Sequence, residues 1–167
     1  MNMAETRVGY SSYQIALHWI IAVLVLFQLV FGDSMKMVIR AAERGQQISA
    51  ADQTMGSAHY WVGIAILALV VLRLALRLAA GAPAPAGEGP QWMQLAARAL
   101  HALFYVLLLA TPVLGLLAFY VGRPWGGLHT LSKPAFIVLI SVHALGAFYH
   151  QFWLRDGTLR RMISPAR

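Results

Sequence analysis

Four stretches of this chain contain no Asp, Glu, Lys or Arg, and each is long enough to cross a lipid bilayer as a helix. They are Val8–Gly32, Gln53–Leu72, Ala99–Gly122 and Pro134–Leu154. A spanning helix needs about 20 mostly apolar residues, because its rise per residue must cover the hydrocarbon core. The stretches therefore predict an all-α integral membrane protein, folded as a four-helix bundle.

The composition agrees with a membrane protein and excludes several other classes. Of the 167 residues, 59% are hydrophobic and 11% are charged, and the mean hydropathy is +0.64. A soluble domain carries about 25% charged residues, so this chain could not cover itself with a polar surface. It has no cysteine, which excludes disulfides, iron–sulfur clusters and thiolate ligation of haem. The net charge of +7 does not indicate nucleic-acid binding, because basic residues at helix ends follow from membrane topology.

We expect one transmembrane domain over residues 1–167, with spans near 11–32, 54–78, 97–121 and 133–154. Four spans place both termini on one side of the membrane. The basic residues on that side are Arg7, Arg73, Arg77, Arg98, Arg155, Arg160, Arg161 and Arg167, and those on the other are Lys36, Arg40, Arg44, Arg123 and Lys133. Basic residues are enriched on the cytoplasmic side of membrane proteins, so both termini are predicted to lie on the cytoplasmic side of a bacterial inner membrane.

Six histidines lie in or beside these apolar segments. They are His18, His59, His101, His129, His143 and His150. Ionisable side chains inside a membrane are costly, so they face the bundle interior and usually serve a function. From the direction of each span, four of them are expected toward the cytoplasmic side, called inner here: His18, His101, His143 and, nearest the surface, His150. His59 and His129 are expected at the outer side.

The spacing on the last span predicts two metal positions. His129 and His143 are fourteen residues apart, which in a continuous helix places them within about 40° of each other and about 21 Å apart along the axis. His18 can then meet His143 at the inner level, and His59 can meet His129 at the outer level. Haem suits such pairs, because its large apolar ring can be held axially by imidazoles from facing helices.

Other uses of histidine were weighed against haem. A single intramembrane histidine could simply hydrogen-bond across helices. Zinc needs about three or four clustered ligands, which pairs at two depths do not supply. A proton-relay transporter would normally carry buried Asp or Glu, and the spans have none.

The chain resembles the bacterial cytochrome b561 family of di-haem membrane cytochromes. The segments that carry the resemblance follow the family order: "ALHW", "HYWVG", "AARALHALFYVLLLATPVLG", "VHALGAFYHQFW" and "RDGTLRRM". The resemblance implies two b haems, each with an iron held by two histidines: His18 and His143 for the inner haem, His59 and His129 for the outer. It places His101 and His150 on the inner side, near haem propionates or a quinone, although either could be the inner ligand in place of His143.

Two features of the sequence bear on the outer haem. Gly32 and Gly115 each follow a histidine by fourteen residues, and we expect them to leave room for the outer ring. Pro134 follows His129 by five residues, and proline breaks the hydrogen-bond ladder inside a helix. If the last helix began near Ser132, His129 would lie in a loop and the fourteen-residue geometry would loosen.

The expected function is transfer of single electrons across the membrane between an outer donor and a membrane quinone such as ubiquinone. Some members of the family oxidise superoxide, and the basic residues on the outer side are compatible with an anionic donor. Two histidine ligands leave iron no open position, so we expect no catalytic side chains in the usual sense. The alternatives are a cytochrome subunit that relays electrons between quinol and a soluble redox partner, and a haem-free transporter or scaffold.

Overall fold

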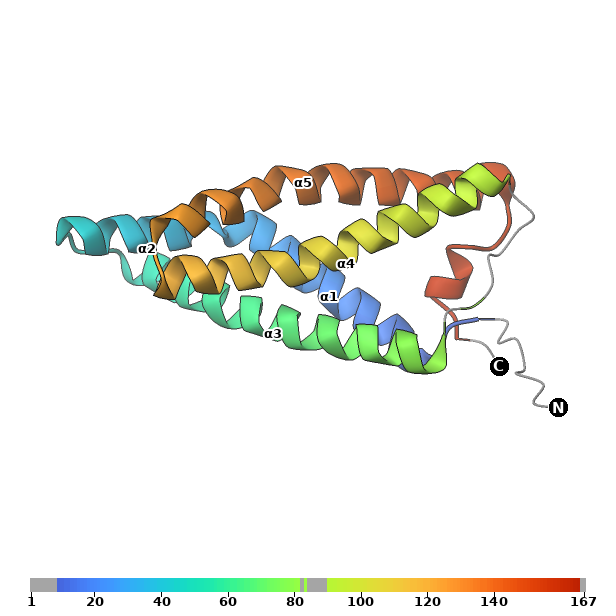
Figure 1. Ribbon diagram of the computed structural model, residues 1–167, viewed down its shortest axis with the longest axis horizontal. Helices are drawn as coiled ribbons and strands as arrows, with labels where there is room; N and C mark the ends of the chain where they lie inside the picture. Colours follow the sequence, from blue (N-terminus) through green and yellow to red (C-terminus); the bar gives the residue numbers. More distant parts are fainter. Residues whose placement is uncertain (1–8, 82, 84–89, 166–167) are drawn as a thin grey trace.

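Four long apolar helices form an elongated bundle (Figure 1). The computed structural model describes residues 9–81, 83 and 90–165. The long helices are α1 (Ser12–Phe31), α3 (Ala50–Ala80), α4 (Gln91–Tyr120) and α5 (Arg123–Phe148), and the shorter elements are α2 (Asp33–Arg44), a π-helix η1 (Tyr149–Leu154) and a 3₁₀ turn η2 (Arg160–Met162). All regular structure in the described ranges is helical, and each long helix can cross a membrane, so the predicted four-helix membrane fold is confirmed.

The chain runs up and down, so helix ends gather at two ends of the bundle. We call the end where α1 begins and α5 finishes the terminal end, and the opposite end the far end (Figure 1). Helix α3 packs against α1 and α4, and α4 packs against α5. One side of α5 therefore faces the interior from the far end to the terminal end.

Local capping fixes where the first two spanning helices begin. At α1, Ser11 and Gln14 form a reciprocal capping box, in which the Gln14 amide N–H donates to the Ser11 hydroxyl and the Ser11 N–H donates to Gln14 Oε1. At α3, the Asp52 N–H donates to the hydroxyl of Ser49. Each cap satisfies backbone donors that the first helical turn leaves unpaired.

The packed core is narrow, and most apolar side chains face outward. The buried cluster consists of Ile21, Val25, Ile66, Val70 and Phe136. Many large apolar side chains outside this cluster are exposed at the surface, such as Leu78 at 78%. In lipid such exposure carries no penalty, because hydrocarbon chains are as apolar as leucine.

Helix α2 was not predicted from the sequence. It follows α1 directly after Gly32, packs on the first turns of α3 and extends past the far end of the bundle (Figure 1). The close contact is at Gly56, where a Cβ would lie 2.6 Å from Cγ2 of Val38, so a side chain on α3 would push the two helices apart. Gly45, with φ +61°, then ends α2 in the left-handed conformation that glycine adopts without strain.

Helix α5 begins earlier than the span expected near residue 133. It starts at Arg123, with Pro124 in its first turn, and continues through Pro134. Proline is favourable in a first turn, and inside membrane helices hydroxyl side chains can satisfy freed backbone groups. His129 lies in the second turn of this helix, so the suggestion that Pro134 leaves it in a loop is wrong. The Ser132 hydroxyl donates to the backbone oxygen of His129 at 2.5 Å.

Candidate functional site

Two histidines meet at the far end of the bundle. His59 on α3 and His129 on α5 have ring centroids 5.9 Å apart, with an angle of 89° between the ring planes. The Nδ1 atom of His129 lies 2.9 Å from the backbone oxygen of Thr111 on α4. A carbonyl oxygen only accepts, so Nδ1 carries the proton and Nε2 is left as the nitrogen with a free lone pair.

Glycines on two further helices lie against these rings, as the sequence suggested. A Cβ on Gly32, at the end of α1, would lie 3.3 Å from Nδ1 of His59. A Cβ on Gly115, on α4, would lie 3.1 Å from Cε1 of His129. Both contacts are tighter than ordinary van der Waals packing. The end of α1 and the helices α3, α4 and α5 therefore meet at this pair, and larger side chains at the two glycine positions would collide with its rings.

The same region holds buried polar atoms without a partner. They are Oε1 of Gln28, Nδ1 of His59 and Oγ1 of Thr111. The Gln28 amide nitrogen donates to the backbone oxygen of His59 at 2.8 Å, so only its oxygen is left over. An unsatisfied buried polar atom costs about 1–3 kcal/mol, and three of them around one histidine pair mark a place built to receive another group.

A second set of histidines meets toward the terminal end, centred on His143 of α5. The ring of His18, from α1, lies 6.2 Å from it with an interplanar angle of 63°. The ring of His101, from α4, lies 5.4 Å from it at 87°. Nδ1 of His101 donates to the backbone oxygen of Ala97 at 2.6 Å, a bond within its own helix. Phe104 covers His143 from the side, with ring centroids 5.4 Å apart.

The two sets lie at different depths along α5, and each is a small group of imidazoles. Fourteen helical residues separate His129 from His143, which is about 21 Å of helix axis. Among the residues that the structure describes, no three His, Cys, Asp or Glu side chains are placed to hold a metal ion together.

His150 lies apart from both sets, on the π-helix that follows α5. Its Nδ1 is 2.5 Å from Oδ2 of Asp156, and its side chain is 30% exposed. Gln151 follows it on the same π-helix. Sequence reasoning had not identified Asp156, and the signal available was its place in the segment "RDGTLRRM" directly after the last span.

Charged groups gather at the far end beside the first histidine pair. Asp33, the residue after Gly32, forms ion pairs of 2.8 Å with Lys36 on α2 and Lys133 on α5. Hydrogen bonds from Lys133 and then Lys36 lower the pKa of Asp33 to about 2. The ionised carboxylate of Asp33 stabilises the folded protein through these ion pairs. This stabilisation is fully present above the ordinary pKa of 3.8, and it is lost as the pH falls through about 2.

Of the other basic residues counted for topology, Arg7, Arg167 and the side chain of Arg123 lie outside the part of the chain that the structure describes. At the terminal end, Arg73 on α3 donates from Nη1 to the backbone oxygen of Gln14 at 2.6 Å. The guanidinium of Arg77 lies over the ring of Tyr105, 5.9 Å from its centroid. Both arginines are thus tied to neighbouring helices.

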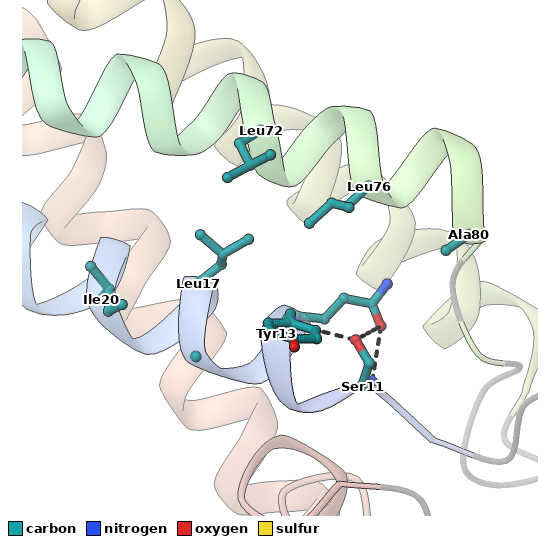
Figure 2. A pocket seen from close by; sticks show the side chains of 9 residues that line it. Ser11, Tyr13, Leu17, Ile20, Leu72, Leu76 and Ala80 are labelled. Carbon is teal, nitrogen blue, oxygen red and sulfur yellow. Dashed lines mark hydrogen bonds between the residues drawn. The ribbon is translucent and has the colours of Figure 1, made fainter.

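An apolar groove of about 700 Å³ runs between α1 and α3 near the terminal end. Figure 2 shows Leu17 and Ile20 of α1 facing Leu72 and Leu76 of α3 across it. The lining is almost entirely carbon, as expected of a surface in contact with lipid chains. Leu17 precedes His18, so the groove passes close to the inner histidines without including them.

Comparisons with known proteins agree with this arrangement. The profile of the family prokaryotic cytochrome b561 matches residues 9–165. The chain is 36% identical to cytochrome b562 of Cereibacter sphaeroides, over 94% of this chain and 96% of that protein. It is 28% identical to cytochrome b561 homolog 1 of Escherichia coli, over 92% and 96% of the two chains, and 26% identical to the probable superoxide oxidase CybB of Yersinia pestis, over 95% and 97%.

The match covers nearly the whole described chain, including every helix that contributes a histidine. The family consists of b-type cytochromes, membrane proteins that bind haem and transfer electrons. The chain is thus a multi-pass bacterial membrane protein that belongs to the prokaryotic cytochrome b561 family.

Proposed function

We propose that this cytochrome holds two b haems and carries single electrons from superoxide, at the outer face, to a quinone at the inner face of the bacterial inner membrane. The observation that carries the proposal is the pair of imidazole sets at two depths of one bundle. The excess of basic residues favours a cytoplasmic terminal end, which makes the far end the outer one.

The spacing of the rings supports haem as the bound group. A nitrogen–metal bond of about 2 Å on each side of an ion puts two imidazole centroids roughly 6 Å apart. The pairs His59–His129 and His18–His143 have centroid distances of 5.9 and 6.2 Å. His101 also faces the ring of His143, but its centroid is only 5.4 Å away, shorter than this spacing. We assign His101 to the surroundings of the inner haem.

The residues around the outer pair also fit such a group. Gly32 and Gly115 keep side chains away from the outer rings, and the unpartnered atoms of Gln28, His59 and Thr111 lie around them. When bound, haem supplies an iron that accepts and releases one electron without binding substrate. The chain's own part is to hold the rings, exclude water between the helices and fix the two depths.

The outer surface supports an anionic donor. Lys36 and Lys133 both pair with Asp33, at the junction of α1 and α2. Lys133 follows His129 by one turn of α5, on the side toward His143. The group of three carries one net positive charge next to the outer histidine pair. Such a field raises the encounter rate of a small anion, and more so at low ionic strength.

The overall reaction balances as two superoxide ions, one quinone and two protons giving two dioxygen molecules and one quinol. His150, Gln151 and His101 are the polar residues of α4 and η1 proposed to face the quinone at the inner side. The positive-inside bias of membrane topology accounts for Arg155, Arg160 and Arg161.

Superoxide should rapidly reduce the haems of the purified protein, and added ubiquinone should then reoxidise them. The change Lys133→Glu should slow the first step roughly tenfold at low salt and much less near 1 M salt, because it reverses a charge beside the outer pair. Stopped-flow absorbance of the haem band measures both steps.

Arg44→Glu is the matched control, since it makes the same charge change at the end of α2, about 16 Å along the helix axis from Asp33. It should slow the reaction far less than Lys133→Glu. Haems that superoxide leaves oxidised, in a protein that contains both, would overturn the proposed donor.

Gly115→Val should lower occupancy of the outer haem and leave the inner haem in place. The added side chain would meet a His129 ring that already lies 3.1 Å from a Cβ at this position, and such overpacking typically costs about 1–3 kcal/mol. The ratio of haem to protein, measured on the purified variant, checks this. The control is Gly127→Ala, since a Cβ at Gly127 meets nothing within 4 Å; equal haem loss in both would refute the assignment.

A second function is a relay of electrons to a soluble partner. The basic helix α2 stands beyond the far end, where a soluble redox partner could reach it (Figure 1). On this alternative the chain relays electrons between quinol and that partner, and the superoxide experiment above separates the two. Family membership gives no support to a haem-free transporter or scaffold.

A further inference from the structure

The inner end of α5 changes its helical type at His150. Regular α-helix stops at Phe148, and Tyr149–Leu154 continue as a π-helix. Arg155 then takes a left-handed conformation with φ 52°, which non-glycine residues rarely adopt. A π-turn widens a helix by one residue, and such turns are frequent at functional sites because they redirect a side chain.

Asp156 closes this turn back onto His150. The backbone N–H groups of Arg155 and Asp156 both point to the backbone oxygen of His150, the latter at 3.4 Å. The Asp156 carboxylate accepts from Nδ1 of His150 through Oδ2 at 2.5 Å, and from the N–H of Thr158 through Oδ1 at 2.9 Å. The backbone and the side chain of His150 are thus both held by the turn.

The charge state of Asp156 suits it to hold the His150 imidazole. The Asp156 side chain is 12% exposed, and this burial raises its pKa. Hydrogen bonds from Thr158 and His150 outweigh burial, so the pKa of Asp156 lies below its ordinary value and the group is a carboxylate at neutral pH. A carboxylate only accepts, so Nδ1 keeps its proton. Within the described residues Asp156 is the hydrogen-bond partner of the His150 ring, which leaves Nε2 for a ligand or water.

The segment after the turn is tied down on the other side of the bundle. In Figure 1 it leaves the end of α5 and carries η2 back toward the start of α1. There the indole N–H of Trp19 donates to the backbone oxygen of Met162 at 2.7 Å. Asp156 therefore sits in a turn anchored at both ends, with little freedom to leave His150.

We propose that Asp156 is a positioning residue for proton delivery: it holds His150 so that Nε2 donates to a quinone carbonyl at the inner end of the bundle. The proposal rests on the proposed quinone reduction. Two superoxide ions supply the two electrons, each becoming dioxygen. One proton moves from Nε2 of the His150 imidazolium to a quinone oxygen, and the second is a proton taken up from the solvent, as in the overall reaction. The ring, left neutral with its Nδ1–H still on Asp156, regains a proton through its exposed side.

The test is Asp156→Asn, which keeps the shape of the side chain and removes its charge. Both haems should be retained, and their reduction by superoxide should be unchanged. Reoxidation by ubiquinone should fall roughly 10–100-fold in kcat, with a smaller change in the KM for quinone, because an amide cannot stabilise the imidazolium that donates the proton. Asp156→Glu should restore part of the rate. Asp52→Asn, which removes an acidic charge at the far end, should leave the quinone step unchanged.

A second measurement does not depend on turnover. ¹⁵N NMR of histidine-labelled protein, with the signal identified by its loss in His150→Gln, should show His150 protonated at Nδ1 in the wild type and an altered signal in Asp156→Asn. A wild-type His150 protonated only at Nε2 would overturn the proposal even if the variant failed to fold.

The outcomes distinguish this inference from the function beneath it. If quinone fails to reoxidise the wild-type haems, the proposed function itself fails. If the wild type is reoxidised and Asp156→Asn matches it, the role of Asp156 is refuted alone. Loss of a haem in Asp156→Asn would also refute it, since His150 would then belong to a haem site.

Discussion

His143→Ala should yield a protein with one haem per chain in place of two. His143 is the imidazole of α5 that lies against His18, and at 5.4 Å also against His101. An alanine there leaves no imidazole on α5 at this depth, and His150 is held away from the set by Asp156. The inner haem should therefore be lost while the outer one stays. Superoxide should still reduce the remaining haem, but ubiquinone should no longer reoxidise it quickly.

Haem stoichiometry and the two stopped-flow steps measure this result. Ser141→Ala is the matched control, because Ser141 lies on α5 two residues before His143 with an exposed side chain. It should retain both haems. Two haems per chain in His143→Ala would contradict the assignment, and the candidates would then be pairs of His18 with His101 or with His150.

His129→Ala should give the reciprocal pattern. The outer haem should be lost, because His59 would have no partner imidazole on α5. The inner haem should remain and should still exchange electrons with quinol. Direct reduction by superoxide should be largely abolished, since the remaining haem lies about 21 Å deeper along the helix axis.

The matched control here is Leu131→Ala, a lipid-facing position of α5 with 64% exposure. It should keep both haems and both electron-transfer steps. An unchanged haem content in His129→Ala would mean that His59 is paired differently, and the mechanism would lose its outer entry point.

Sequence reasoning could predict the membrane bundle because length and apolarity alone decide whether a helix spans. It could also predict which histidines meet, since the fourteen-residue spacing on α5 is set by helix geometry. The start of α5 was harder, because Pro134 is a strong local signal for a helix boundary. The helix nevertheless runs through it from Arg123 to Phe148.

Three other features could not be predicted from span length and helix geometry. Helix α2 is mostly exposed. The apolar side chains that it places near Gly56 of α3 are Met35 and Val38, a pair too short to stand out beside the spans. The π-helix at His150 has no simple sequence signature. Asp156 becomes notable only when the turn at Arg155 brings it back to the imidazole.

One rod carries an imidazole for each proposed haem. His129 and His143 belong to the same continuous helix α5, so the axial distance between the two proposed metal positions is set by the number of residues between them. Changes in the length of the loops or of the other helices would not alter this distance. A single residue inserted between the two histidines would swing one of them by about 100° around the axis, so this fourteen-residue stretch is where the protein tolerates no change of length.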